Sequence, residues 1–173
     1  MNRIQAILQF WFEGVDDSTP IDKGKRPFSK WFRADKALDQ EIQERFESDL
    51  NNALTGKYQD LEKSPQGSLA LALLYDQFTR NMYRDTPKMY MADARAWKLA
   101  LRLTSGQKEH TLYLVERVFI YMPLMHVEDI QAQRLSVQYF AELVEESKNK
   151  NPGNTHYYNY SLDYANRHRA IIE

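Results

Sequence analysis

Residues 64–83 read SPQGSLALALLYDQFTRNMY and predict a helix that is apolar on nearly every side. Ser64 can cap the helix start because its side-chain oxygen accepts a free backbone N–H, and Pro65 is favoured at the first helical position. Apolar residues then continue almost without a break from Leu69 to Leu74. Such a helix packs against neighbours on several sides. We therefore expect a central helix over about residues 65–83.

Further helices are predicted on both sides of this segment. Between Asp35, which can cap a helix start, and Gly56, which can end it, apolar residues recur every four positions at Leu38, Ile42, Phe46, Leu50 and Leu54. Similar patterns predict helices over about 4–12, from Thr86-Pro87 to Ser105-Gly106, over 111–122, from there to about 147, and over 155–172. Pro123 lacks the N–H that a continuing helix needs, so we expect an end or kink there.

The pattern as a whole predicts an all-α protein. No segment shows sustained alternation of apolar and polar residues, which a half-buried strand would require. Short turns between long helices force antiparallel neighbours, and successive hairpins either bundle or stack into a right-handed superhelix. A 34-residue repeat of the tetratricopeptide kind is not evident. At 173 residues the chain fits a single all-helical domain.

Composition excludes several classes of protein. The chain has no cysteine, which excludes thiol nucleophiles, zinc knuckles and disulfide frameworks and favours a cytoplasmic location. Its 23 basic and 24 acidic side chains nearly cancel, so no overall positive field draws it to nucleic acid or to anionic lipid. The N-terminal residues lack the features of a signal peptide, and no apolar run is long enough to predict a membrane span.

The first group of polar residues in an apolar setting is Asp76, Arg80 and Asn81, at the end of the central helix. Asp76 and Arg80 are four positions apart and share one helix face with Leu69 and Leu73. One interpretation is a structural ion pair that locks two helices together, since breaking a buried pair is costly. The other is that Arg80 reaches into a cleft as an anion clamp, oriented by Asp76.

The second group is His126, Glu128 and Asp129, just after Pro123. We expect these side chains at a helix start, facing a cleft that the kink opens. A histidine followed by acids could be a general base with an orienting carboxylate, or part of a metal site. Only His126 and Asp129 share a face, which is too few ligands for a metal. Acids at a helix start also have an ordinary interpretation, as caps that complement the helix dipole.

The third group is Arg167-His168-Arg169, near the C-terminus. A basic triplet in a last helical turn complements the negative end of the helix dipole. Alternatively it joins the other two groups in a site for phosphate or carboxylate. The chain has no glycine-rich phosphate loop, no G-x-S-x-G, no H-E-x-x-H and no G-x-G-x-x-G, so we expect neither a cofactor nor a metal.

The same three groups carry a resemblance to a known family. DQFTRN at 76–81, YMPLMHVED at 121–129 and RHRAII at 167–172, preceded by WF at 11–12 and 31–32, resemble the bacterial family called domain of unknown function 924. The resemblance implies a helical superhelix similar to tetratricopeptide repeats and no established activity. Thr79 stands where members commonly have proline. Members also usually continue beyond the position of Glu173, so the resemblance implies a further short C-terminal segment.

Three functional hypotheses follow. The first is a polar cleft that binds a small anionic ligand or a peptide through Asp76, Arg80, Asn81, His126, Asp129, His168 and Arg169. The second is a small hydrolase or isomerase with His126 as general base, oriented by Asp129 or Glu128, while Arg80 holds an anionic group. The third is a protein–protein interaction scaffold, for example a homodimer joined through an aromatic face.

Overall fold

The helix expected at the centre runs from Pro65 to Met82 in the computed structural model, which describes residues 2–173. It consists of α4 (Pro65–Ala72), a π-helical segment (Leu73–Phe78) and α5 (Thr79–Met82). Every side chain from Leu69 to Leu74 is fully buried. The prediction of a central helix packed on several sides is therefore confirmed.

The other helices surround this segment. They are α1 (Arg3–Phe12), α2 (Phe28–Phe32), α3 (Lys36–Leu54), α6 (Asp93–Ser105), α7 (Leu114–His126), α8 (Ile130–Lys150) and α9 (Thr155–Ile172). Short 3₁₀ turns lie at Gln59–Lys63, Pro87–Tyr90, Lys108–Thr111 and Pro152–Asn154. Residues 2–173 contain no strand, and the all-α class is confirmed. Stacking as a tetratricopeptide-like superhelix stays a prediction.

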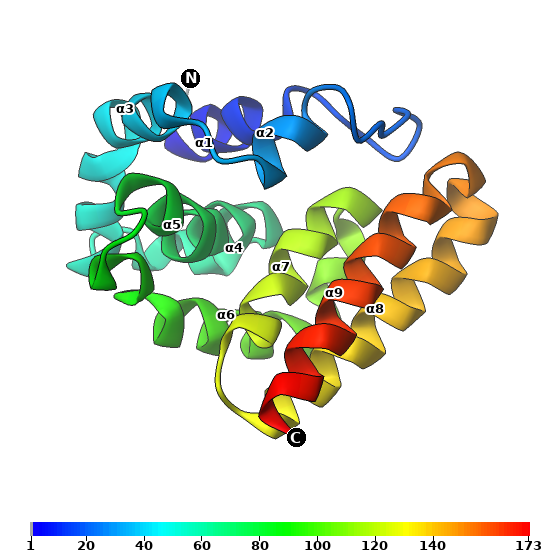
Figure 1. Cartoon of the computed structure of the whole chain (residues 1–173). Coiled ribbons are helices and arrows are strands. Elements are labelled where there is room, and N and C mark those ends of the chain that lie inside the picture. The colour runs from blue at the N-terminus through cyan, green and yellow to red at the C-terminus, as the bar shows by residue number, and fades with distance from the viewer. Residues whose placement is uncertain (1) are drawn as a thin grey trace.

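Figure 1 shows two groups of helices that meet at the central one. The chain packs α1 and α3 on one side of α4 and α5, and α6 on another side. The helices α7, α8 and α9 run side by side, and α7 contacts both α4 and α6. Within residues 2–173, no helix combines the length and the apolar character that a membrane crossing requires.

The short helix α2, which sequence patterns do not predict, is held by the end of α1. The last carbonyls of a helix have no partner within that helix. Trp31 Nε1 donates to the carbonyl of Trp11 at 2.8 Å, and the buried ammonium of Lys30 donates to the carbonyl of Phe10. The Trp31 ring also packs edge-on against Phe119 of α7, with ring centroids 5.3 Å apart. These contacts fix α2 between α1 and α7.

Two helix ends differ from the predictions. Thr86-Pro87 begins only a 3₁₀ turn, and α6 starts at Asp93, because the Thr86 hydroxyl donates to the Tyr83 carbonyl instead of capping a new helix. Pro123 does not end α7, which continues to His126 with Leu124 and Met125 buried.

The continued end of α7 has its own cap. The Gln133 side-chain amide donates to the carbonyls of Met125 at 2.6 Å and Val127 at 2.9 Å. His126 therefore lies in the last turn of α7. The prediction that it lies at the start of the next helix is wrong.

The start of the central helix depends on a close backbone approach at Gly67. Ser64 Oγ accepts the Gly67 N–H at 3.0 Å, as the capping pattern predicts. A Cβ atom at Gly67 would lie only 2.0 Å from the Leu61 carbonyl oxygen, which belongs to the preceding 3₁₀ turn. Because that obstacle is backbone, it cannot move aside cheaply.

We predict that Gly67→Ala lowers the free energy of unfolding by about 1–3 kcal/mol or more, as expected for a forced overlap. Gly106→Ala is the matched control, because a Cβ there meets only the flexible Lys108 side chain at 3.5 Å. The control should change stability by no more than about 0.5 kcal/mol. Urea unfolding of both variants provides the measurement, and equal losses would contradict the close approach.

Candidate functional site

A cavity of about 280 Å³ lies where α2, α5, α7 and α9 meet. Its polar lining includes three arginines and two histidines: Arg33, Arg80, Arg84, His126 and His168. Its apolar lining includes Trp31 and Phe32 from α2 and Val118, Met122 and Met125 from α7. Gln77, Asn81, Tyr160, Ser161 and Tyr164 complete most of the wall. The site thus combines cationic groups with an apolar surface.

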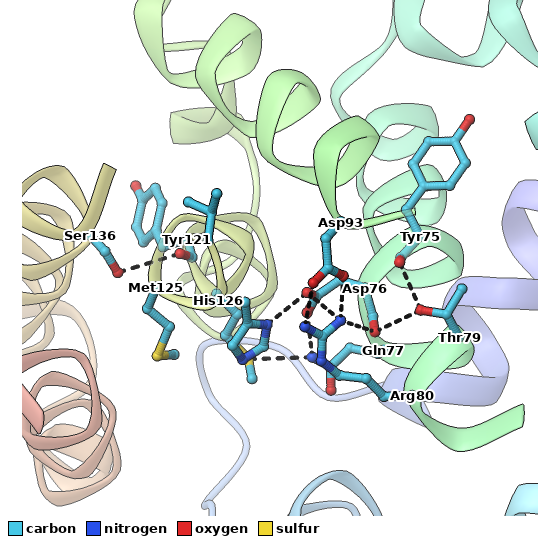
Figure 2. A network of polar contacts seen from close by, with 12 residues as sticks. Tyr75, Asp76, Gln77, Thr79, Arg80, Asp93, Tyr121, Met125, His126 and Ser136 are labelled. Atoms are coloured by element: carbon cyan, nitrogen blue, oxygen red, sulfur yellow. Dashed lines mark hydrogen bonds and ion pairs between the residues drawn. The ribbon is translucent and has the colours of Figure 1, made fainter. Parts of the chain in front are cut away.

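Asp76 lies behind the cavity wall as a buried carboxylate with three side-chain partners. It is 1% exposed. Its Oδ1 lies 2.7 Å from His126 Nδ1 and 3.1 Å from Arg80 Nη1, and its Oδ2 accepts from Gln77 Nε2 at 2.6 Å. Figure 2 shows His126 and Arg80 directed at Asp76. Burial alone would raise the pKa of Asp76, but His126 and Arg80 lower this pKa to about 2. The carboxylate is therefore ionised at neutral pH.

This contact fixes the orientation of His126. An ionised carboxylate can only accept hydrogen bonds, so the proton must sit on Nδ1 of the imidazole. The remaining ring nitrogen, Nε2, is then the one available to a molecule in the cavity that His126 lines. The arrangement is that of a histidine held in one tautomer by an acidic partner.

Arg80 is fixed by a second carboxylate. Its Nη1 and Nη2 donate to the two carboxylate oxygens of Asp93, at 2.8 and 3.0 Å. Nη1 also lies 3.0 Å from the backbone carbonyl oxygen of Asp76. A guanidinium paired in this two-pronged way is held in one position. Asp93 belongs to α6, so the interaction ties the central helix to α6 as well as holding Arg80 at the cavity.

The π-helical segment Leu73–Phe78 supplies both Asp76 and Gln77. Thr79 follows it directly, and its hydroxyl lies 2.8 Å from the Tyr75 carbonyl and 3.1 Å from the Asp76 carbonyl. The helix stays continuous here, and the hydroxyl gives those carbonyls an additional donor. Single-turn π segments are frequent at functional sites. Thr79 therefore supports the widened turn that presents Asp76.

The opposite wall carries His168. Its ring centroid is 5.8 Å from that of His126. Burial lowers the pKa of His168, and the nearby His126 and Arg80 lower it further. Because the ordinary pKa of histidine is about 6.5, His168 is mostly neutral at pH 7. Two imidazoles thus face the same space from α7 and α9.

The remaining cationic residues differ in how they are paired. Arg84 donates through Nε and Nη2 to Asp39, at 2.6 and 2.9 Å, and the Asn81 amide donates to the same carboxylate at 2.8 Å. Arg33 is exposed and forms no ion pair with any residue in the 2–173 range. The cavity therefore has at least one arginine with its full donor capacity unused.

Five of the predicted site residues come together here. Arg80, Asn81, His126 and His168 line the cavity, and Asp76 contacts two of them from behind. Sequence reasoning missed Arg33 and Arg84. Arg84 follows Arg80 by four residues, a spacing that places two side chains on one helix face and so could have revealed it.

The other predicted residues lie outside the cavity lining. Asp129 accepts the Ala132 N–H at 2.8 Å and caps α8, which is the ordinary interpretation of that acid. Glu128 is exposed, and Arg169 lies 3.8 Å from Glu173. The prediction that Asp129 or Glu128 orients His126 is therefore wrong. The partner is Asp76, because α7 extends past Pro123 and carries His126 to the central helix.

No three or more His, Cys, Asp or Glu side chains gather closely enough to hold a metal ion in the part of the chain that the structure describes.

Comparisons with known proteins place the chain in a family. A solved structure of a protein of unknown function from Agrobacterium tumefaciens is similar, with 29% sequence identity and a TM-score of 0.76. The match covers 98% of this chain and 81% of that one. No protein with a curated description matches. The family model described as "Bacterial protein of unknown function (DUF924)" matches residues 7–173. The chain therefore belongs to the DUF924 family.

Proposed function

We propose that the cavity binds a small anionic molecule. The observation that carries this proposal is that the charged side chains lining the cavity are positive. Arg33, Arg80 and Arg84 all face the cavity, and none of its lining residues within 2–173 is acidic. The carboxylates that pair with Arg80 and Arg84 lie outside the lining; they are Asp39, Asp76 and Asp93. A molecule in the cavity therefore meets cationic donors first.

The size and the apolar part of the lining narrow the kind of molecule. A volume of about 280 Å³ lies just below the range for small-molecule sites, roughly 300–1,000 Å³. This favours a small ligand over a peptide. Met122 and Met125 offer polarisable surface, and Trp31 offers an aromatic face. The preferred ligand is thus an organic anion with an apolar body.

We predict that Arg33→Gln weakens binding of small organic anions about fivefold, because one charge-assisted hydrogen bond is lost at an exposed position. Arg33 has no ion pair to disturb, so the fold should remain intact. The measurement is an NMR titration of the full chain with benzoate and with phenyl phosphate, following the resonances of His126 and His168. Arg95→Gln is the matched control, since Arg95 is also an exposed arginine but lies on α6 outside the cavity lining. Anions that perturb only residues outside the cavity would contradict the proposal.

A second candidate function is acid–base catalysis on the bound anion, with His126 as general base. The observation that favours it is the contact of 2.7 Å between His126 Nδ1 and Asp76 Oδ1. A buried carboxylate that holds one imidazole nitrogen leaves the other ready to accept a proton. Ser161 also lines the cavity, but its hydroxyl donates to the Tyr157 carbonyl at 3.2 Å. The chemistry thus rests on proton transfer, as in a hydrolase that activates water or in an isomerase.

The tautomer of His126 tests this candidate. In ¹⁵N NMR spectra of the neutral His126 ring, Nδ1 should carry the proton and Nε2 should not. Asp76→Asn should relax that preference, because an amide can both donate and accept. The exposed His110 is the internal control and should not respond. A neutral His126 ring with its proton on Nε2 instead of Nδ1 would exclude the general-base role.

The same variant has a defined effect on acid stability. Asp76 has a pKa of about 2 in the folded chain, against an ordinary value of 3.8. The stability that its ionised form contributes is therefore present above pH 4 and is lost as the pH falls toward 2. We predict that the stability difference between the unaltered chain and Asp76→Asn shrinks by about 2 kcal/mol between pH 4 and pH 2. Urea unfolding across this range measures it, and a constant difference would contradict the assignment.

A further inference from the structure

The unused donors at the cavity come from different directions. Arg33 follows α2 and has all of its guanidinium N–H groups available. Arg84 follows α5 and uses Nε and Nη2 on Asp39, which leaves Nη1. His168 stands on α9, and its ring makes no hydrogen bond within residues 2–173. Three elements therefore each contribute a donor group that the protein itself does not use.

This arrangement distinguishes between classes of anion. A carboxylate is planar and has two oxygens, so one arginine can satisfy it from one side. A phosphate monoester presents three strong acceptor oxygens and carries a charge of about −1.5 to −2 at neutral pH. Its oxygens point in three directions. Donors from three elements, with His126 on a fourth, suit a tetrahedral head group better than a planar one.

The two imidazoles fit the same head group. His126 is held through Nδ1 by Asp76, so its Nε2 is the nitrogen that faces a ligand. The His168 ring lies next to the His126 ring, with ring centroids 5.8 Å apart. The second proton of a phosphate monoester has a pKa near 6, close to that of an imidazole, so a proton can be shared between them. His126 can donate from Nε2 to a phosphate oxygen once its ring is protonated, and His168 has a donor nitrogen in either form.

We propose that the ligand of this cavity is a phosphate monoester of a small apolar or aromatic compound. This proposal rests on the proposed function and names the ligand class. The phosphate sits beside the two adjacent imidazoles of His126 and His168 and is contacted by Arg33 and Arg84. The organic group of the ester lies against Met122 and Met125, on the apolar side of the same cavity.

The proposal is tested by NMR titration of the full chain at pH 7 with three probes: inorganic phosphate, phenyl phosphate and benzoate. Phenyl phosphate should bind most tightly, since it alone supplies both the tetrahedral head group and an apolar body. We expect it to bind about tenfold more tightly than benzoate, the difference that one additional charge-assisted hydrogen bond makes. Phenyl phosphate should also raise the pKa of His168, because a nearby anion favours the protonated ring.

His168→Gln provides the variant. It should weaken phenyl phosphate binding about tenfold and weaken benzoate binding by a smaller factor. His110→Gln is the matched control, because His110 is exposed and does not line the cavity. The pKa measurement on the unaltered chain does not depend on whether the His168 variant folds.

Each other outcome has a definite meaning. Equal binding of benzoate and phenyl phosphate would overturn the phosphate assignment while leaving an anion site in place. If inorganic phosphate binds as tightly as phenyl phosphate, the assignment of a phosphate monoester is overturned. The ligand is then free phosphate. Failure of all three probes to perturb His126 and His168 would overturn the proposed function itself.

Discussion

The burial of the Asp76 carboxylate is the constraint on which the centre of this molecule depends. Taking a carboxylate out of water costs several kcal/mol unless donors surround it. Here the donors come from Gln77 beside it, from Arg80 one turn later and from His126 on α7. Arg80 in turn needs Asp93 on α6. One buried charge therefore requires the π-helical segment, α5, α6 and α7 to hold fixed positions, and those positions define one side of the cavity.

Sequence patterns predict the local features of this arrangement but not the contacts between residues far apart in the chain. The apolar run from Leu69 to Leu74 predicts the central helix because periodicity is a local property. The spacing of four predicts that Asp76 and Arg80 share a face for the same reason. The contact between Asp76 and His126 spans 50 positions, and no local pattern encodes it. The neighbouring acids Glu128 and Asp129 were therefore the natural but incorrect partners for His126.

The remaining misses have physical causes of the same kind. Pro123 removes one backbone hydrogen bond, yet buried Leu124 and Met125 and the cap from Gln133 keep α7 helical to His126. The five-residue helix α2 is too short to show a periodicity, and it exists because Lys30 and Trp31 satisfy carbonyls at the end of α1. Arg33 owes its place to that docking. Local sequence patterns cannot predict which residues tertiary contacts bring to a site.

The docking of α2 on α1 also means that residues outside the cavity fix the positions of residues that line it. Docking of α2 on α1 helps to bring Trp31, Phe32 and Arg33 to the cavity. Side chains of α2 donate there to the backbone carbonyls of Phe10 and Trp11. A change that shifts the end of α1 would move one wall of the cavity without touching any lining residue. Among relatives of this chain, differences in ligand preference could therefore originate in the first dozen residues, where a comparison restricted to the cavity would not look.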